Sequence, residues 1–420
     1  MKLRGLTLAT VLASCALVAG ARARTSAAED GYDLWLRYGR VADSARLAEY
    51  RAAISELVIP QGEATLQAAR DELALGLNGL LGLPVPVADA PTRDGTLVVG
   101  TPANSPTIAS VRLAAALRDA GPDGFVIRAL PVRGHHAIVV AANRDSGVLY
   151  GVFHLLRLLQ TEESLAQLDV VSTPRYSLRL LNHWDNLDGT VERGYAGASL
   201  WEWARLPDSI SPRYRDYARA NASIGINGTV LTNVNANATA LTPEYLGKVA
   251  ALADVFRPYG LRVYLTARFS APIELGGLAT ADPRDSVVRA WWRRKVDEIY
   301  RAVPDFGGFV VKANSEGQPG PQEYGRTHAD GANMLADALA PHGGVVMWRA
   351  FVYSSAVPTD RVRQHVRAVG VAAMVVLRAW LPLGVGLDDK AAEVRNRPID
   401  LVGLHRPPGT DARVQGIGGG

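Results

Sequence analysis

The sequence predicts an α/β protein in which a small α/β N-terminal domain precedes an incomplete (β/α)8 barrel of the TIM type. Apolar strand-like runs recur after residue 176 with helical patterns between them, which is typical of parallel strands joined by crossover helices. Upstream, strands alternate with amphipathic helices in a shorter unit. We therefore place the N-terminal domain at 29–175, the first five βα units at 176–364, and a divergent, poorly ordered tail at 365–420.

The first residues are typical of a secretory signal peptide. Two basic residues precede an apolar stretch at 6–20, and the Ala-Arg-Ala string at 21–23 is a cleavage candidate, so we exclude 1–28 from the fold. The stretch is too short for a comfortable membrane span. We expect a secreted or periplasmic protein; the alternative is a lipoprotein anchored at Cys15, the single cysteine of the chain.

Local patterns justify the N-terminal unit. Apolar positions at helical spacing predict a helix over 63–82, and a second helix with a broad apolar face opens at Asp145. Three short apolar runs predict strands at 96–100, 124–127 and 137–141.

The barrel region is predicted from five strand-like runs. They lie at 178–182, 225–231, 261–267, 307–313 and 343–349. Two helix starts are expected between them, because a capping side chain precedes proline at Thr242-Pro243 and at Asp282-Pro283. Function is expected at the carboxyl ends of the strands, where barrel loops carry chemistry.

The fourth of these strands ends in a charged loop that contains Lys312 and Glu316. A glutamic acid there can protonate a leaving-group oxygen if its surroundings keep it protonated. The ammonium of Lys312 opposes that role unless an anionic substrate neutralises it, which hints at an anionic substrate. The alternative from residue types alone is a solvated Glu316 beside a Lys312 that snorkels to the surface.

Three more side chains follow barrel strands. Arg349 can grip a carboxylate with two hydrogen bonds or form a structural ion pair. Trp184 can stack on a sugar face or cap the barrel core, and His183 is interpreted as a structural hydrogen-bonding residue. No spacing of His, Cys and Asp demands a metal, so we expect no metal and no cofactor. The basic residues are scattered and the net charge is +4, which predicts no nucleic-acid partner.

Several strings resemble the α-glucuronidases of glycoside hydrolase family 67, which release 4-O-methylglucuronic acid from xylan-derived oligosaccharides. The resemblance covers about 30–364, and its most specific part is Asn-Ser-Glu-Gly-Gln-Pro-Gly-Pro at 314–321. The other matching strings are Gly31 to Tyr38, Gly147 to Arg157, Asn182 to Asn186, Glu192 to Gly197, Lys312 to Gly320, and Trp348 to Phe351.

The resemblance implies a role for each matching residue. Glu316 matches the general acid, and Lys312 and Arg349 match residues that hold the uronate. Trp184 matches the aromatic wall of the sugar pocket, and Val234 matches a residue near the 4-O-methyl group. It also implies an inverting mechanism, in which a second carboxylate activates water.

The resemblance ends, we expect, after about residue 364, where a frameshift followed by early termination would account for it. The catalytic base is then not identifiable, and we expect weak or absent activity. Full-length relatives would dimerise through a helical C-terminal domain, and we do not extend that expectation to this chain.

Two alternative functions stay open. One is a non-catalytic uronate-binding protein. The other is a β-hexosaminidase-like enzyme, which would need an adjacent acid pair at the fourth strand, whereas Asp71-Glu72 and Asp297-Glu298 lie in helix patterns.

Overall fold

The structure is a computed structural model that describes residues 30–315 and 317–349, together with the backbone of 371–372. Residues 30–37 form a series of turns, in which the Leu36 amide donates to the Asp33 carbonyl at 2.9 Å. This stretch belongs to a separate compact unit from the chain that begins at Tyr38.

The first sheet has five strands in the order β1-β2-β4-β3-β5. Its strands are β1 (Glu56–Val58), β2 (Thr96–Gly100), β3 (Phe125–Val132), β4 (His135–Ala142) and β5 (Asp169–Ser172). β1, β2 and β4 run parallel, whereas β3 pairs antiparallel with β4 and β5. The predicted strands in this region are therefore confirmed, while β1 and β5 were not predicted.

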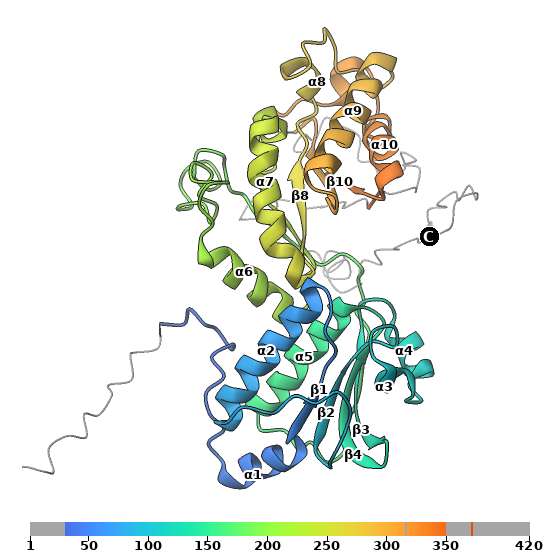
Figure 1. Cartoon of the computed structure of the whole chain (residues 1–420). Coiled ribbons are helices and arrows are strands. Elements are labelled where there is room, and N and C mark those ends of the chain that lie inside the picture. The colour runs from blue at the N-terminus through green and yellow to red at the C-terminus, as the bar shows by residue number, and fades with distance from the viewer. Residues whose placement is uncertain (1–29, 316, 350–370, 373–420) are drawn as a thin grey trace, which may run out of the picture. The chain divides into compact units, whose positions relative to one another are not determined.

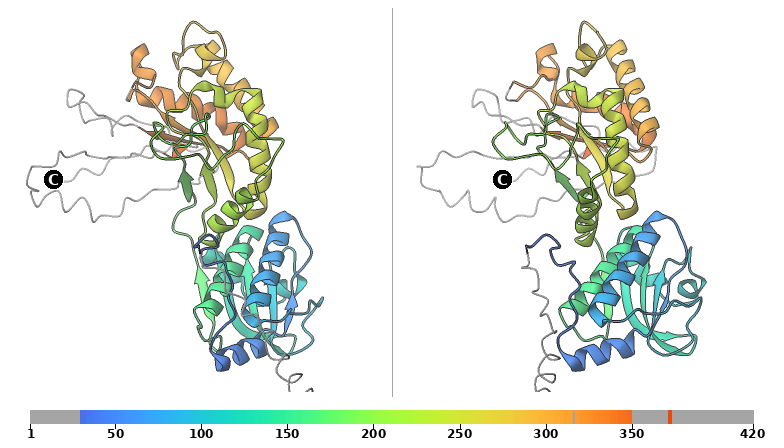
Figure 2. Two further views of the ribbon diagram at one scale, coloured as in Figure 1. Left: turned by 90° about the vertical axis from the view of Figure 1, so that its left-hand side faces the viewer. Right: turned by 60° about the vertical axis from the view of Figure 1, so that its left-hand side comes forward.

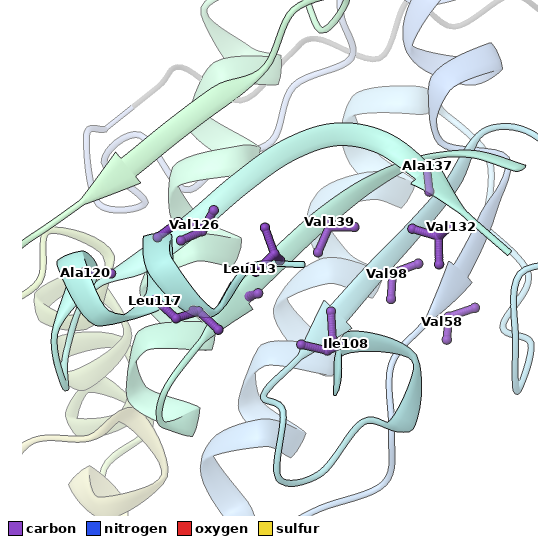
Figure 3. Packing of buried hydrophobic residues seen from close by; sticks show 12 residues of the cluster. Val58, Val98, Ile108, Leu113, Leu117, Ala120, Val126, Val132, Ala137 and Val139 are labelled. Atoms are coloured by element: carbon purple, nitrogen blue, oxygen red, sulfur yellow. The ribbon is translucent and has the colours of Figure 1, made fainter. Parts of the chain in front are cut away.

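Helices pack on both faces of this sheet. α2 (Ala64–Leu81) and α5 (Asp145–Gln160) lie side by side on one face, and α3 (Pro106–Ala109) and α4 (Ala114–Ala120) lie on the other (Figure 1). α1 (Ser44–Ala53) precedes β1. Figure 3 shows how side chains of the strands, such as Val98 and Val139, meet Ile108 and Leu117 from the short helices. Burial of such apolar side chains is the main stabilising contribution to a domain of this kind.

The second sheet has six parallel strands in the order β11-β10-β9-β8-β7-β6. Its strands are β6 (Leu180–Asn182), β7 (Gly228–Val230), β8 (Arg262–Thr266), β9 (Gly308–Lys312), β10 (Val345–Arg349) and β11 (Val371–Ala372). Neighbours in sequence are neighbours in the sheet, which is the order of strands in a TIM-type barrel. The predicted fold class, an α/β domain followed by an incomplete barrel, is confirmed.

Crossover helices follow the barrel strands. They are α6 (Pro212–Ser223), α7 (Pro243–Phe256), α8 (Ala271–Glu274), α9 (Ser286–Ala302) and α10 (His328–Leu339), with 3-10 turns η1 (Ala238–Leu241), η2 (Arg257–Tyr259), η3 (Pro321–Tyr324) and η4 (Ala340–His342). In Figure 2, α7, α9 and α10 (yellow-green to orange) lie on one side of the strands. Because strand side chains alternate between faces, each strand packs under a helix with one face and turns the other towards the barrel interior.

One of the two predicted helix starts is wrong, and the other is confirmed in position. α9 begins at Ser286 and is capped by Asp285, whose carboxylate accepts from the amides of Val287 and Val288 at 2.7 and 3.1 Å. Asp282 is not the cap; its carboxylate accepts from the Arg284 amide at 2.9 Å, before the helix begins, and from Arg326. Thr242 does precede α7, yet its hydroxyl makes no cap and donates instead to a carbonyl of the preceding turn.

Candidate functional site

The candidate site lies at the carboxyl edge of the barrel sheet. All described pairings in this sheet are parallel, so the residues that follow β6 to β10 gather at one edge. Four of the five site residues expected from the sequence are described there, namely Trp184, Val234, Lys312 and Arg349. Glu316 lies outside the described residues.

Two cations occupy neighbouring strand ends. Lys312 at the end of β9 is in register with Arg349 at the end of β10. Each lies two residues beyond a member of the interior apolar cluster, Val310 and Met347, so both point to the interior face. Lys312 is only 3% exposed, and its Nζ donates to the Asn235 Oδ1 at 2.9 Å. Adjacent cations at one edge favour an anionic ligand there.

Trp184 forms one side of this edge. The centroid of its ring lies 5.7 Å from the guanidinium carbon of Arg349, a cation–π arrangement. The half-buried ring also packs against the interior cluster that contains Val234, which is buried. The core-capping interpretation of Trp184 is therefore correct for part of the ring. The same contacts bring together three of the residues expected to surround the sugar.

The loop after β6 is anchored by Asp185. Its Oδ2 accepts from the Ser199 hydroxyl at 2.6 Å and the Leu200 amide at 2.9 Å, and its Oδ1 lies 3.3 Å from the His183 Nδ1. Burial alone would raise the pKa of Asp185, but the hydrogen bonds from His183, Ser199 and Leu200 lower it below its ordinary value. His183 also meets the Tyr217 hydroxyl at 2.8 Å, as expected for a structural residue.

The residues around Glu316 form a tight turn. The Gln318 amide donates to the Ser315 carbonyl at 2.9 Å, and Asn314 and Gly317 have φ values of +50° and +75°. The side chain of Gln318 accepts from the Arg268 Nη1 at 3.0 Å. The described residues on either side of position 316, Ser315 and Gln318, are therefore bonded to each other at the carboxyl edge.

Sequence reasoning missed three residues at this edge: Asn233, Asn235 and Arg268. The two asparagines follow β7 and reach the loop after β6 and the last residue of β9, and Arg268 follows β8. A polar residue just past a barrel strand is a signal that could have found them. The contacts that join them to other strand ends, with Trp184, Gln318 and Lys312, span 49, 50 and 77 positions along the chain, which no local pattern specifies.

The adjacent acid pairs considered for the β-hexosaminidase-like alternative lie on helices. Asp71-Glu72 lies on α2, where Glu72 accepts two hydrogen bonds at 2.8 Å from Arg219. Asp297-Glu298 lies on α9, where His342 and Lys295 contact the two carboxylates. Neither pair lies at the end of β9, so the described residues do not provide what that rival requires.

The described residues contain no group of three or more His, Cys, Asp or Glu that could hold a metal ion. Within the same ranges, no helix has both the length and the apolar composition needed to cross a bilayer.

The described structure is an α/β domain followed by an incomplete TIM-type barrel, in which polar side chains gather at the carboxyl edge of the barrel sheet. Two family models match the chain: "Glycosyl hydrolase family 67 N-terminus" over residues 34–155 and "Glycosyl hydrolase family 67 middle domain" over 158–371. The chain therefore belongs to glycoside hydrolase family 67. The second match continues past residue 364, where we expected the resemblance to end.

Curated relatives agree with this family. "Probable alpha-glucuronidase A" of Neosartorya fischeri is 42% identical over 381 residues, covering 90% of this chain and 44% of the relative. "Alpha-glucuronidase A" of Emericella nidulans is 39% identical over 341 residues, covering 78% of this chain and 39% of the relative. The chain thus spans less than half the length of these relatives. Among solved structures, a GH138 enzyme targeting pectin rhamnogalacturonan II matches with a TM-score of 0.46 and 15% identity, covering 70% of this chain and 35% of that one.

Proposed function

We propose that this protein is an α-glucuronidase-type glycoside hydrolase that releases glucuronic acid, or its 4-O-methyl derivative, from xylan-derived oligosaccharides. The observation that carries the proposal is the pair of cations at neighbouring strand ends, Lys312 and Arg349, beside the ring of Trp184. A uronic acid offers a carboxylate for the cations and an apolar sugar face for the ring.

The proposed reaction is a single displacement with inversion. Glu316 donates a proton to the glycosidic oxygen as the bond to the anomeric carbon breaks. A water molecule attacks that carbon from the opposite face, and a second carboxylate about 6.5–9.5 Å from the first accepts its proton. Lys312 and Arg349 hold the uronate carboxylate, which fixes the sugar relative to Glu316. Val234 and Trp184 line the side of the sugar in this proposal.

The test measures turnover and binding separately. Purified protein is incubated with aldobiouronic or aldotetraouronic acid, and released 4-O-methylglucuronic acid is quantified with its anomeric configuration by NMR. Because no catalytic base is identified, we expect only weak release, with the α-linked sugar appearing as the β-anomer. This turnover should be lost in Glu316→Gln with binding of glucuronate retained, because that substitution removes the acid and keeps the shape of the side chain.

Three other outcomes would contradict the proposal in different ways. Binding of glucuronate without turnover would favour the non-catalytic uronate-binding alternative. Turnover that survives Glu316→Gln would remove Glu316 from the acid role. Release of the α-anomer would overturn inversion.

Export is a second part of the proposal. It is supported by the apolar stretch at 6–20 and the cleavage candidate at 21–23. Mass analysis of the protein exported from a bacterial host would give a new N-terminus near residue 24 for a secreted or periplasmic protein. A lipid-modified N-terminus at Cys15 would support the lipoprotein alternative instead.

A further inference from the structure

Asn233 lies where the loops after β6 and β7 meet at the carboxyl edge. Its side chain is 1% exposed. Its amino group donates to the Trp184 carbonyl at 3.2 Å, the Glu192 carbonyl at 3.1 Å and the Asn186 Oδ1 at 3.0 Å. Its Oδ1 accepts from the Asn235 amide at 2.9 Å. Every polar atom of this buried amide therefore has a partner, which fixes the side chain in one orientation.

Asn235 continues the chain of hydrogen bonds to β9. Its amide donates to Asn233, and its Oδ1 accepts from the Lys312 Nζ at 2.9 Å. The main chain reinforces the connection, because the Asn233 amide also donates to the Asp185 carbonyl at 2.8 Å. The loop after β7 thus holds the loop after β6 on one side and the lysine of β9 on the other.

These contacts close into a ring. Trp184 connects through Asn233 and Asn235 to Lys312, Lys312 is in register with Arg349, and the guanidinium of Arg349 faces the Trp184 ring. A displacement of one member is therefore passed to the others. The two asparagines are the members of the ring to which the family resemblance assigns no role.

We propose that Asn233, acting through Asn235, is a positioning residue that sets the distance between the aromatic wall at Trp184 and the ammonium of Lys312. The inference rests on the proposed function, since it assigns the two positioned groups to one uronic acid. Asn233 itself contacts main-chain and amide atoms, not the sugar, and acts through the residues that it holds.

The experiment compares Asn233→Ala with a matched control, Asn227→Ala. Asn227 precedes β7 as Asn233 follows it, and it likewise bridges to the chain beside β6, through the Arg179 amide at 2.9 Å and the Ser177 carbonyl at 2.7 Å. We expect Asn233→Ala to lower kcat/KM on aldobiouronic acid about 100-fold, mainly through KM, because misplacement of binding groups by about 1 Å has effects of that size. Asn227→Ala should stay within about 2-fold of the unmodified protein, because the amino end carries stability and not catalysis.

A conservative pair at Asn235 tests the second step. Asn235→Gln keeps a neutral amide oxygen that can accept from Lys312, whereas Asn235→Leu removes it. We expect Asn235→Gln to retain most of the binding of glucuronate and Asn235→Leu to lose it. A purely structural role would instead lower the melting temperature of both without separating their affinities.

A readout without turnover keeps the inference separate from the proposed function. The rate at which an acylating reagent modifies Lys312, followed by peptide mass mapping, should rise in Asn233→Ala and Asn235→Leu and stay unchanged in Asn227→Ala. If the unmodified protein neither binds nor cleaves the uronic acid, the proposed function fails while this labelling still decides the inference. If Asn233→Ala does not fold, Asn235→Leu carries the same comparison. Labelling and kinetics of Asn233→Ala that match those of Asn227→Ala would overturn the inference.

Discussion

The two ends of the barrel strands use the same residue types for different purposes. At the amino end of β7, the side chain of Asn227 bonds to main-chain atoms of Ser177 and Arg179. At the carboxyl end, Asn233 bonds to Trp184, Asn186 and Glu192, and through Asn235 to Lys312. Both asparagines join the chain around β6 to that around β7. The amino ends of β6 and β7 are thus bonded to each other, whereas their carboxyl ends are bonded to residues that the proposed function assigns to substrate binding.

The largest expected effect tests whether the carboxyl ends of the barrel strands bind an anion. Lys312→Met and Arg349→Met should each lower kcat/KM for a glucuronosyl substrate about 100- to 1000-fold, because charge-assisted hydrogen bonds to the substrate carboxylate are lost. Activity on the matching neutral glucosyl compound should change far less. Steady-state kinetics on the two substrates measure the ratio of kcat/KM for the glucuronosyl compound to kcat/KM for the glucosyl compound.

Arg294→Met is the matched control for these two variants. Arg294 is an exposed cation on α9, and its loss should leave the ratio unchanged. An equal loss on the charged and neutral substrates in Lys312→Met would show that the cation supports the fold and does not recognise the carboxylate.

The next effect concerns a buried acid in the N-terminal domain, where we expect stability alone to change. The carboxylate of Glu56 accepts from the Thr92 amide and hydroxyl and from the Thr96 hydroxyl, at 2.9, 2.5 and 2.9 Å. Burial by itself raises the pKa of Glu56, but these bonds and Arg93 outweigh it and hold the pKa at about 2, below the ordinary 4.5. The ionised form therefore stabilises the folded protein above about pH 4.5, and this contribution disappears as the pH falls towards 2.

Glu56→Gln should accordingly lower the free energy of unfolding by about 2 to 3 kcal/mol at pH 7. The difference from the unmodified protein should shrink between about pH 4.5 and 2. Denaturant unfolding across this range measures it, with Glu163→Gln, an exposed acid of the same domain, as the control. A constant difference at every pH would refute the assignment of the effect to the charge of Glu56.

Much of the scaffold could be predicted from the sequence because its strands are buried on both faces. β9 is buried along its whole length and therefore reads as a continuous apolar run. The short strand β1 escaped prediction because three residues carry too little pattern. The start of α9 was misplaced because two aspartates lie before the helix, and the amides of its first turn bond to Asp285, the later of the two.

The candidate site could be predicted only where the family resemblance assigns a residue. Lys312, Arg349 and Trp184 were identified in that way, and the structure brings them to one edge. Asn233 was missed although its neighbour Val234 was selected, because its hydrogen-bond partners lie in the loop after β6, more than 40 positions away along the chain. Strand order and register, which arise from the whole sheet, create those contacts.

The smallest effect again compares the two ends of one strand, β8. Arg268 follows the strand, and its Nε donates to the Glu274 Oε1 at 2.6 Å while its Nη1 reaches Gln318 beside the turn that contains Glu316. Arg257 precedes the strand, and its Nε and Nη2 pair with Asp305 at 2.9 and 2.8 Å. We expect Arg268→Ala to lower kcat about 10-fold with little change in KM, because it removes the contact with Gln318, near the proposed acid, and leaves in place the two cations that are proposed to bind the uronate.

Arg257→Ala should leave kcat and KM unchanged and cost at most about 1 kcal/mol of stability, since its ion pair lies near the surface. Steady-state kinetics and unfolding curves of the two variants, side by side, separate the roles of the two ends. A loss of kcat in Arg257→Ala equal to that in Arg268→Ala would mean that the rigidity of the whole strand, and not the contact with Gln318, determines kcat. Arg268→Lys keeps the positive charge but loses the planar pair of donors that arginine offers to Glu274 and Gln318. A kcat equal to that of the unmodified protein in this variant would show that a single cation near Gln318 is sufficient for full turnover.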